Sequence, residues 1–202
     1  MAGYTFTNSD REPPNSLPTE FTITAPPSTD IWRKPPSTHS FTAPILHRTL
    51  PLSSFLKARL AVSAKWETLY DQGGLILVVP QHDGTHKWVK TGIEFVHGRA
   101  KVSTVAADRW ADWSLVPLAN EGGNSVTVEM AREEGGSLWV YVIEGVERRP
   151  IRKVTWVFED AEHDGQKGRE CWVGAYAARP SKEGEGLEVS FGHLLIETNE
   201  DK

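Results

Sequence analysis

Lys90 and Glu94 are the ionisable side chains whose spacing most directly indicates chemistry, because they stand four residues apart in segment 86–97. On an extended strand such residues share one side, about 13 Å apart, so they cannot form a direct ion pair. Each could contact a different part of one ligand, and in an enzyme Glu94 could act as a base and Lys90 as an electrostatic stabiliser. Taken singly, each is also an ordinary charged residue of a solvated strand.

Large aromatic rings accompany these two groups, and the chain holds eight tryptophans among 202 residues. Trp88 shares the side of its strand with Lys90. The same alternation places four further rings on the more polar sides of their strands: Trp139, Tyr141, Trp172 and Tyr176. Solvated sheet faces are normally rich in Thr, Lys, Glu and Ser. These rings therefore indicate either an aromatic-lined ligand surface or packing between two sheets, and both interpretations stay open.

Familiar catalytic motifs are missing from the sequence. It contains no Gly-x-x-x-x-Gly-Lys-Ser/Thr loop, no Gly-x-Gly-x-x-Gly and no Gly-x-Ser-x-Gly elbow. His82 and His86 flank a glycine turn without a cysteine or carboxylate cluster to complete a tetrahedral site, so we predict no metal and no cofactor. Retaining glycosidases need two carboxyl groups roughly 5–5.5 Å apart. Glu94 and Glu129 have no acidic partner on their own strands, which disfavours glycoside hydrolysis but leaves a partner from another strand open.

The elements that would position these residues are strands, because apolar and polar residues alternate from about residue 52 onward. Leu56–Ala64 also carries leucines at helical spacing, but its longer alternation favours a strand, and Gly74–Val79 predicts a buried central strand. The acidic stretch Glu159–Gly168 is predicted as a loop or one helical turn. Many short strands indicate an all-β sandwich or barrel. The other predicted strands are 86–97, 101–106, 112–118, 125–131, 137–143, 151–158, 171–178 and 187–196.

The start of the chain differs from the rest, since nine of its 13 prolines lie at or before Pro51. Residues 1–20 are polar and proline-rich, which predicts a flexible polar N-terminal arm. Residues 21–51 hold short β-like pieces between prolines and are predicted as extended edge segments on the core. We therefore expect one domain over residues 21–198.

Composition limits the partners and the compartment. With 22 basic and 27 acidic side chains the formal net charge is −5, which argues against nucleic acid. No apolar run approaches the ~20 residues that span a bilayer, and the first residues do not resemble a secretory signal. Cys171 is the single cysteine and no Asn-x-Ser/Thr sequon occurs, which together favour a cytoplasmic protein. A homodimer through a sheet edge stays open.

Several short segments occur in order along the chain: Thr29-Asp30-Ile31-Trp32-Arg33, Tyr70-Asp71-Gln72-Gly73-Gly74-Leu75, Lys87 to Glu94, Ser103-Thr104-Val105, Asp112-Trp113-Ser114, Val173 to Pro180 and Val189-Ser190-Phe191. Together they resemble a domain-of-unknown-function family that includes the fungal regulation-of-enolase protein. The resemblance spans about residues 25–197, and the long proline-bearing start is similar to that of the fungal branch.

This resemblance implies a concanavalin A-like jelly-roll sandwich of two curved antiparallel sheets, with the concave face as the usual ligand site. It places seven residues at or near that face: Tyr70, Gln72, Trp88, Lys90, Glu94, Asp112 and Ser114. No activity is established for the family, and the acidic catalytic strand motif of the glucanase branch is missing here. The resemblance therefore defines the fold better than the function.

Three functions follow from these observations. The first is a cytoplasmic sandwich that binds a carbohydrate-like or other small ligand on its concave aromatic face. The second is a non-hydrolytic enzyme of fungal metabolism, an isomerase, lyase or cyclase, using the same pocket. The third is a metabolic regulator acting by protein–protein contact. The predicted ligand-binding set is Tyr70, Gln72, Trp88, Lys90, Glu94, Asp112, Ser114, Trp139, Tyr141, Trp172 and Tyr176, with Lys90 and Glu94 as the catalytic candidates.

Overall fold

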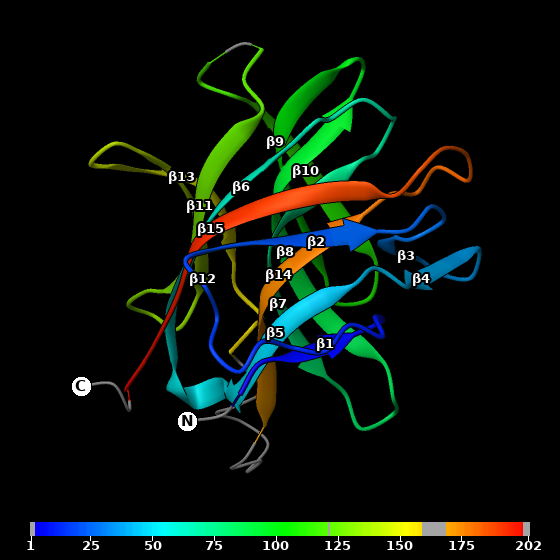
Figure 1. The fold of residues 1–202 in the computed structure, drawn as a ribbon. Helices are drawn as coiled ribbons and strands as arrows, with labels where there is room; N and C mark the ends of the chain where they lie inside the picture. The colour runs from blue at the N-terminus through cyan, green and yellow to red at the C-terminus, as the bar shows by residue number, and fades with distance from the viewer. Residues whose placement is uncertain (1–2, 121, 159–168, 200–202) are drawn as a thin grey trace.

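Strands follow one another along almost the whole chain (Figure 1). The structure is a computed structural model that describes residues 3–120, 122–158 and 169–199. Within these ranges no helix is long and apolar enough to cross a membrane. The elements are β1 (Thr5–Thr7), β2 (Glu20–Ala25), β3 (Ile31–Lys34), β4 (Thr38–Phe41), β5 (Ile45–Pro51), the short 3-10 helix η1 (Leu52–Ser54), β6 (Phe55–Ala64), β7 (Gln72–Pro80), β8 (His86–Val96), β9 (Arg99–Ala107), β10 (Ala111–Pro117), β11 (Ser125–Arg132), β12 (Leu138–Glu144), β13 (Glu147–Val154), β14 (Glu170–Ala178) and β15 (Leu187–Thr198).

These strands form two large antiparallel sheets that pack face to face (Figure 1). The seven-stranded sheet has the order β1-β5-β14-β7-β8-β9-β10, and the six-stranded sheet has the order β13-β12-β11-β6-β15-β2. Strands β3 and β4 pair only with each other and form a separate hairpin. The predicted fold class, a jelly-roll sandwich of two curved antiparallel sheets, is confirmed.

The main core lies between the two sheets, because alternate side chains of each strand point into that space. Leu75, Leu77 and Val79 of β7 meet Leu60 of β6 and Val140 of β12 in one hydrophobic cluster. Each aliphatic side chain buried in this way stabilises the fold by about 1.5–3 kcal/mol relative to exposure. The core therefore fixes which side of each strand faces inward.

A second hydrophobic cluster covers the opposite face of the seven-stranded sheet. Ile31 of β3 and Ala43, just after β4, pack there against Ile76, Trp88 and Tyr176 of the sheet. Trp88 is 1% exposed and Tyr176 is 2% exposed. Of the two interpretations that the sequence left open for this side of β8, packing therefore applies to Trp88 and Tyr176, because the β3–β4 hairpin lies over them.

Three local expectations differ from the structure. The strand predicted at 151–158 is β13, Glu147–Val154, because Gly145, with a φ of 62°, turns the chain directly back from β12. Among the pieces expected at sheet edges, β2 is an edge strand, but β5 lies between β1 and β14. In the expected N-terminal arm, Thr5–Thr7 pairs with β5 as β1. The loop predicted at Glu159–Gly168 lies outside the described residues.

Candidate functional site

Lys90 lies at the centre of the polar residues that the β3–β4 hairpin covers. Its side chain is 2% exposed, and Nζ donates to the carbonyl oxygen of Ile31 at 2.7 Å and to Oε1 of Gln72. The ammonium also lies 5.5 Å from the ring centroids of both Trp88 and Tyr176, within the range of cation–π attraction. Lys90 thus joins the hairpin backbone to the sheet beneath it.

Gln72 and Asp30 continue this network toward the edge of the hairpin. Gln72 Nε2 donates to Asp30 Oδ1 at 3.3 Å and to the carbonyl oxygen of Tyr70 at 3.2 Å. Burial lowers the pKa of Lys90, while the negative charges of Asp30 and Glu94 act in the opposite direction. The carboxylates therefore help to keep the buried lysine protonated.

Glu94 lies on the same side of β8 as Lys90 and is 7% exposed. Ser103 Oγ donates to Glu94 Oε2 at 2.7 Å, and Trp113 Nε1 donates to Ser103 Oγ at 3.0 Å. Burial raises the pKa of Glu94, and the charge of Lys90 and the hydrogen bond from Ser103 partly oppose that rise. This chain of donors fixes the orientation of a nearly buried carboxyl group.

Trp113, which reaches Glu94 through Ser103, contacts two further rings, and we call Trp32, Tyr70 and Trp113 the aromatic rim. Trp113 makes edge contacts with Tyr70 (centroids 6.3 Å apart) and with Trp32 (6.1 Å apart). Tyr70 is 41% exposed and has a φ of 66°, a conformation uncommon for a residue with a side chain. The rim therefore presents ring surface to solvent next to an oriented carboxyl group.

The structure brings six members of the predicted ligand-binding set together. Gln72 and Lys90 are joined by a hydrogen bond, and Glu94, across from Gln72 in the β7–β8 pairing, acts on Lys90 through its charge. The rings of Trp88 and Tyr176 lie beside Lys90, and the carbonyl oxygen of Tyr70 accepts from Gln72. Most of these groups are buried, and only Tyr70 among them is strongly exposed. Their role in binding a ligand stays a prediction.

The other five members of the predicted set lie elsewhere. Asp112 and Ser114 of β10 both contact Arg152 of β13, at 2.6 Å and 3.2 Å. Trp139 and Tyr141 lie on the side of β12 away from the core, in the other sheet. Trp172 lies on the same face of the seven-stranded sheet as Trp88, across Val78 from it, and packs against the second hydrophobic cluster without joining the polar contacts of Lys90. The predicted single aromatic face is thus divided among several surfaces.

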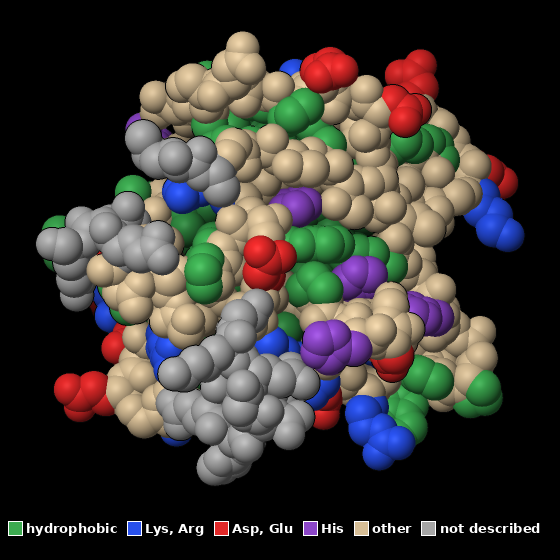
Figure 2. All heavy atoms as spheres, turned by 90° about the horizontal axis from the view of Figure 1, so that it is seen from below, with side chains coloured by type: hydrophobic (Ala, Val, Ile, Leu, Met, Phe, Trp, Pro, Cys, Tyr) green, Lys and Arg blue, Asp and Glu red, His purple; other side chains and the backbone are tan. Residues whose placement is uncertain are grey.

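Around Trp172 the structure shows a stack of rings that the sequence did not predict. Phe41 stacks on His86 (4.4 Å), His86 lies beside Trp172 (5.3 Å), and Trp172 stacks on His47 (4.7 Å). Histidine and hydrophobic side chains gather on the lower face of the molecule (Figure 2). Within the described residues no group of three or more His, Cys, Asp or Glu side chains is placed to hold a metal ion.

Sequence reasoning missed four residues of the site. Asp30, Trp32, Ser103 and Trp113 all contact the polar network or the rim, yet none belongs to the predicted ligand-binding set. All four occur in the segments that carry the family resemblance. Their presence in these segments could have identified them as site residues. Alternation alone could not, because it does not predict that β3 packs over β8.

The two antiparallel sheets packed face to face, one of them covered by the β3–β4 hairpin, define a β-sandwich protein. Residues 8–199 match the family described as "Protein of unknown function (DUF1349)", and the chain belongs to this family. The resemblance noted in the sequence is therefore confirmed.

Two related proteins were found by sequence. An uncharacterised protein of Emericella nidulans is 54% identical over 202 residues, covering 99% of this chain and 98% of that protein. Regulation of enolase protein 1 of Saccharomyces cerevisiae is 30% identical over 182 residues, covering 87% of this chain and 80% of that protein. Neither name assigns a reaction or a ligand.

Two solved structures support the fold. A functionally unknown protein from Saccharomyces cerevisiae superposes with a TM-score of 0.74 at 24% identity, covering 96% of each chain. A GH43 protein, BlXynB, from Bacillus licheniformis superposes with a TM-score of 0.59 at 13% identity, covering 90% of this chain and 33% of that one. At these identities the similarity shows the fold alone.

Proposed function

We propose that the protein binds a small carbohydrate-like ligand at the aromatic rim, with the carboxyl group of Glu94 as its polar anchor. The observation that carries this proposal is the hydrogen-bond chain from Trp113 through Ser103 to Glu94, beside the exposed ring of Tyr70. Ring faces pack on the apolar faces of sugars, and a carboxylate accepts hydrogen bonds from hydroxyl groups.

Lys90 has an indirect part in this proposal. At 2% exposure its ammonium does not reach the solvent, and two of its donor contacts are already used by Ile31 and Gln72. It is a positioning residue that holds the hairpin, and therefore Trp32, over the sheet. Glu94, whose carboxyl group lies nearer the surface, is the group that meets the ligand.

A titration of a glycan and polyol panel against matched variants tests the proposal. Tyr70→Asn removes the ring from the rim, and asparagine tolerates the positive φ of this position. Glu94→Gln removes the negative charge, and the amide oxygen can still accept the hydrogen bond from Ser103. Each change is expected to weaken the ligand's affinity about tenfold. Trp139→Ala, which removes a half-buried ring from the other sheet, is the control and should leave affinity unchanged.

Unchanged affinity in both rim variants, or weaker binding by the Trp139 control, would contradict the proposed site.

One observation favours a second function, proton transfer by Glu94. Burial raises the pKa of this carboxyl group toward neutral pH, which suits it to act as an acid or base. If Glu94 acts in this way, the bound ligand will exchange a carbon-bound proton in deuterated buffer with the wild type and not with Glu94→Gln. Binding without exchange would leave ligand binding as the function.

A further inference from the structure

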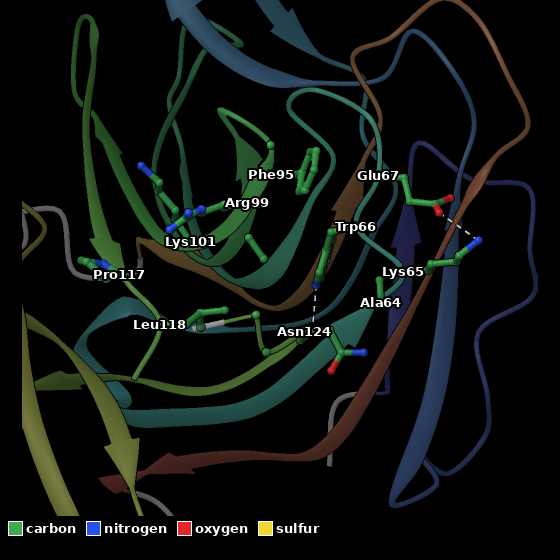
Figure 3. A pocket seen from close by; sticks show the side chains of 14 residues that line it. Ala64, Lys65, Trp66, Glu67, Phe95, Arg99, Lys101, Pro117, Leu118 and Asn124 are labelled. Carbon is green, nitrogen blue, oxygen red and sulfur yellow. Dashed lines mark hydrogen bonds and ion pairs between the residues drawn. The ribbon is translucent and has the colours of Figure 1, made fainter. Parts of the chain in front are cut away.

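A pocket of about 720 Å³ opens at one end of the sandwich, between the two sheets (Figure 3). Its wall comes from the end of β6, from β8 and β9 near their turn, and from the segments that follow β10 and precede β11. Ligand pockets in proteins commonly measure about 300–1,000 Å³. None of the three aromatic-rim residues lines this pocket, so it is a separate site from the one proposed above.

The inner wall of the pocket is apolar. Trp66 and Leu118 are 7% and 8% exposed, and Ala64, Phe95 and Ala100 pack partly against the main core. Trp66 Nε1 donates to the carbonyl oxygen of Asn124 at 2.8 Å, which satisfies the polar edge of the indole and holds the ring in place. A ligand with an aromatic or aliphatic body would bury apolar surface against this wall without displacing a hydrogen bond.

The flanks of the pocket carry an excess of positive charge. On one flank Lys65 and Glu67 form an ion pair at 2.9 Å and offset each other (Figure 3). Arg99 and Lys101 lie together on the opposite flank (Figure 3). Among the described lining residues Glu67 is the one acidic side chain. Glu94 stands across from Lys101 in the β8–β9 pairing and offsets part of its charge, so Arg99 supplies most of the attraction for an anionic group on the second flank.

We propose that this pocket binds a small amphipathic anion, with its apolar body against Trp66, Phe95 and Leu118 and its carboxylate or sulfonate toward Arg99 and Lys101. The apolar wall supplies the burial, and the two basic side chains select a negative charge over a neutral polar group. The proposal does not depend on the function of the aromatic rim.

Anilinonaphthalene sulfonate, which joins apolar rings to a sulfonate and brightens in apolar surroundings, is a suitable probe of the full chain. The wild type should bind it at one saturable site. Ala100→Phe places a ring in the pocket and should weaken binding at least about tenfold, because the apolar volume is filled. The double change Arg99→Glu and Lys101→Glu should also weaken binding about tenfold while the folded state, followed by circular dichroism, is kept.

The matched control is Lys34→Glu with Lys182→Glu, which changes the net charge equally at exposed positions outside the pocket lining. It should bind the probe as the wild type does. Decanoate should displace the probe at lower concentration than decanol. Equal binding by Ala100→Phe and the wild type overturns the site, and equal displacement by decanoate and decanol with no effect of the charge reversal overturns the anionic class of ligand.

Discussion

Two buried ionisable side chains, Lys90 and His47, differ in how fully their nitrogen atoms are hydrogen-bonded. Burial lowers the pKa of Lys90 and the charges of Asp30 and Glu94 oppose that change, while Nζ donates to Ile31 and Gln72. His47, 3% exposed, has Nε2 3.0 Å from Thr7 Oγ1, while Nδ1 is buried and has no hydrogen-bond partner among the described residues. A charged imidazole would need a partner for that nitrogen, so His47 is held in its neutral form.

His47 makes stability depend on pH in a defined window. Burial lowers its pKa from 6.5 to about 4, so below pH 6.5 the unfolded chain binds a proton that the folded chain does not. This contribution is fully present above about pH 6.5 and is lost as the pH falls toward 4, by about 1–3 kcal/mol in total. Urea unfolding at pH 7.5, 6 and 5 should show a smaller loss for His47→Gln than for the wild type. The exposed His97→Asn is the control, and equal losses in all three proteins would refute the assignment.

At the scale of elements, the β3–β4 hairpin determines which side chains of the seven-stranded sheet are exposed to a ligand. Alternation correctly predicted that Trp88, Lys90 and Glu94 share one side of β8, and Val89 and Ile93 on its other side face the main core. Alternation could not predict that the side with Lys90 is buried, because the covering hairpin lies about 50 residues earlier in the chain and holds its place through long-range contacts such as that of Ile31 with Lys90. Exposure of a strand face is a tertiary property that period-2 patterning does not contain.

Beneath the hairpin, β7 and β8 approach each other at a glycine pair, Gly74 and Gly92. A Cβ added at Gly74 would meet the carbonyl oxygen of Thr91 and lie 2.7 Å from Gly92 Cα, and both obstacles are backbone. Gly74→Ala is therefore expected to lower the free energy of unfolding by about 1–3 kcal/mol or more. Gly192→Ala in β15, where the nearest atom to an added Cβ is 3.9 Å away, should change it by less than about 0.5 kcal/mol. Denaturant unfolding of the two variants checks this, and similar values would contradict the close approach.

Across the whole molecule, the sequence predicted which side of its strand each aromatic ring occupies, but it did not predict which of the two sheets each strand joins. Trp88 and Trp139 both stand opposite aliphatic core positions, yet β8 and β12 belong to different sheets. Strand order arises from pairing between distant segments, and the ordered family-like motifs, not periodicity, were what indicated the two curved sheets. The candidate site is consequently smaller than predicted: Glu94 and Tyr70 remain, while Trp139 and Tyr141 lie beside the buried Glu129 carboxylate and its arginine partners in the other sheet.

The segment after β1 contacts the hairpin that covers the seven-stranded sheet. Asn8, with a φ of 59°, donates through Nδ2 to the carbonyl oxygens of Phe41 and Ala43, both at 3.0 Å, and so ties the segment after β1 to the hairpin that covers Lys90. Asn8→Gly removes both hydrogen bonds and still permits the positive φ, so the backbone of the turn is unstrained. Each lost bond is worth about 0.5–1.5 kcal/mol, enough to raise the population of an opened hairpin several-fold.

Amide hydrogen exchange measures how often the hairpin opens. The amides of Thr42 and Ala43 donate to the carbonyl oxygen of Asp30 at 2.9 and 3.3 Å, so they exchange only when these bonds break. In Asn8→Gly these amides should exchange about three- to tenfold faster, since each 1.4 kcal/mol corresponds to a factor of ten in the opening equilibrium. Amides of β11 and β12, in the other sheet, should keep their wild-type rates. Unchanged exchange at Thr42 and Ala43 would show that the hairpin is held by Lys90 and its apolar contacts alone. Acceleration in both sheets would mean that Asn8 supports global stability instead of the hairpin.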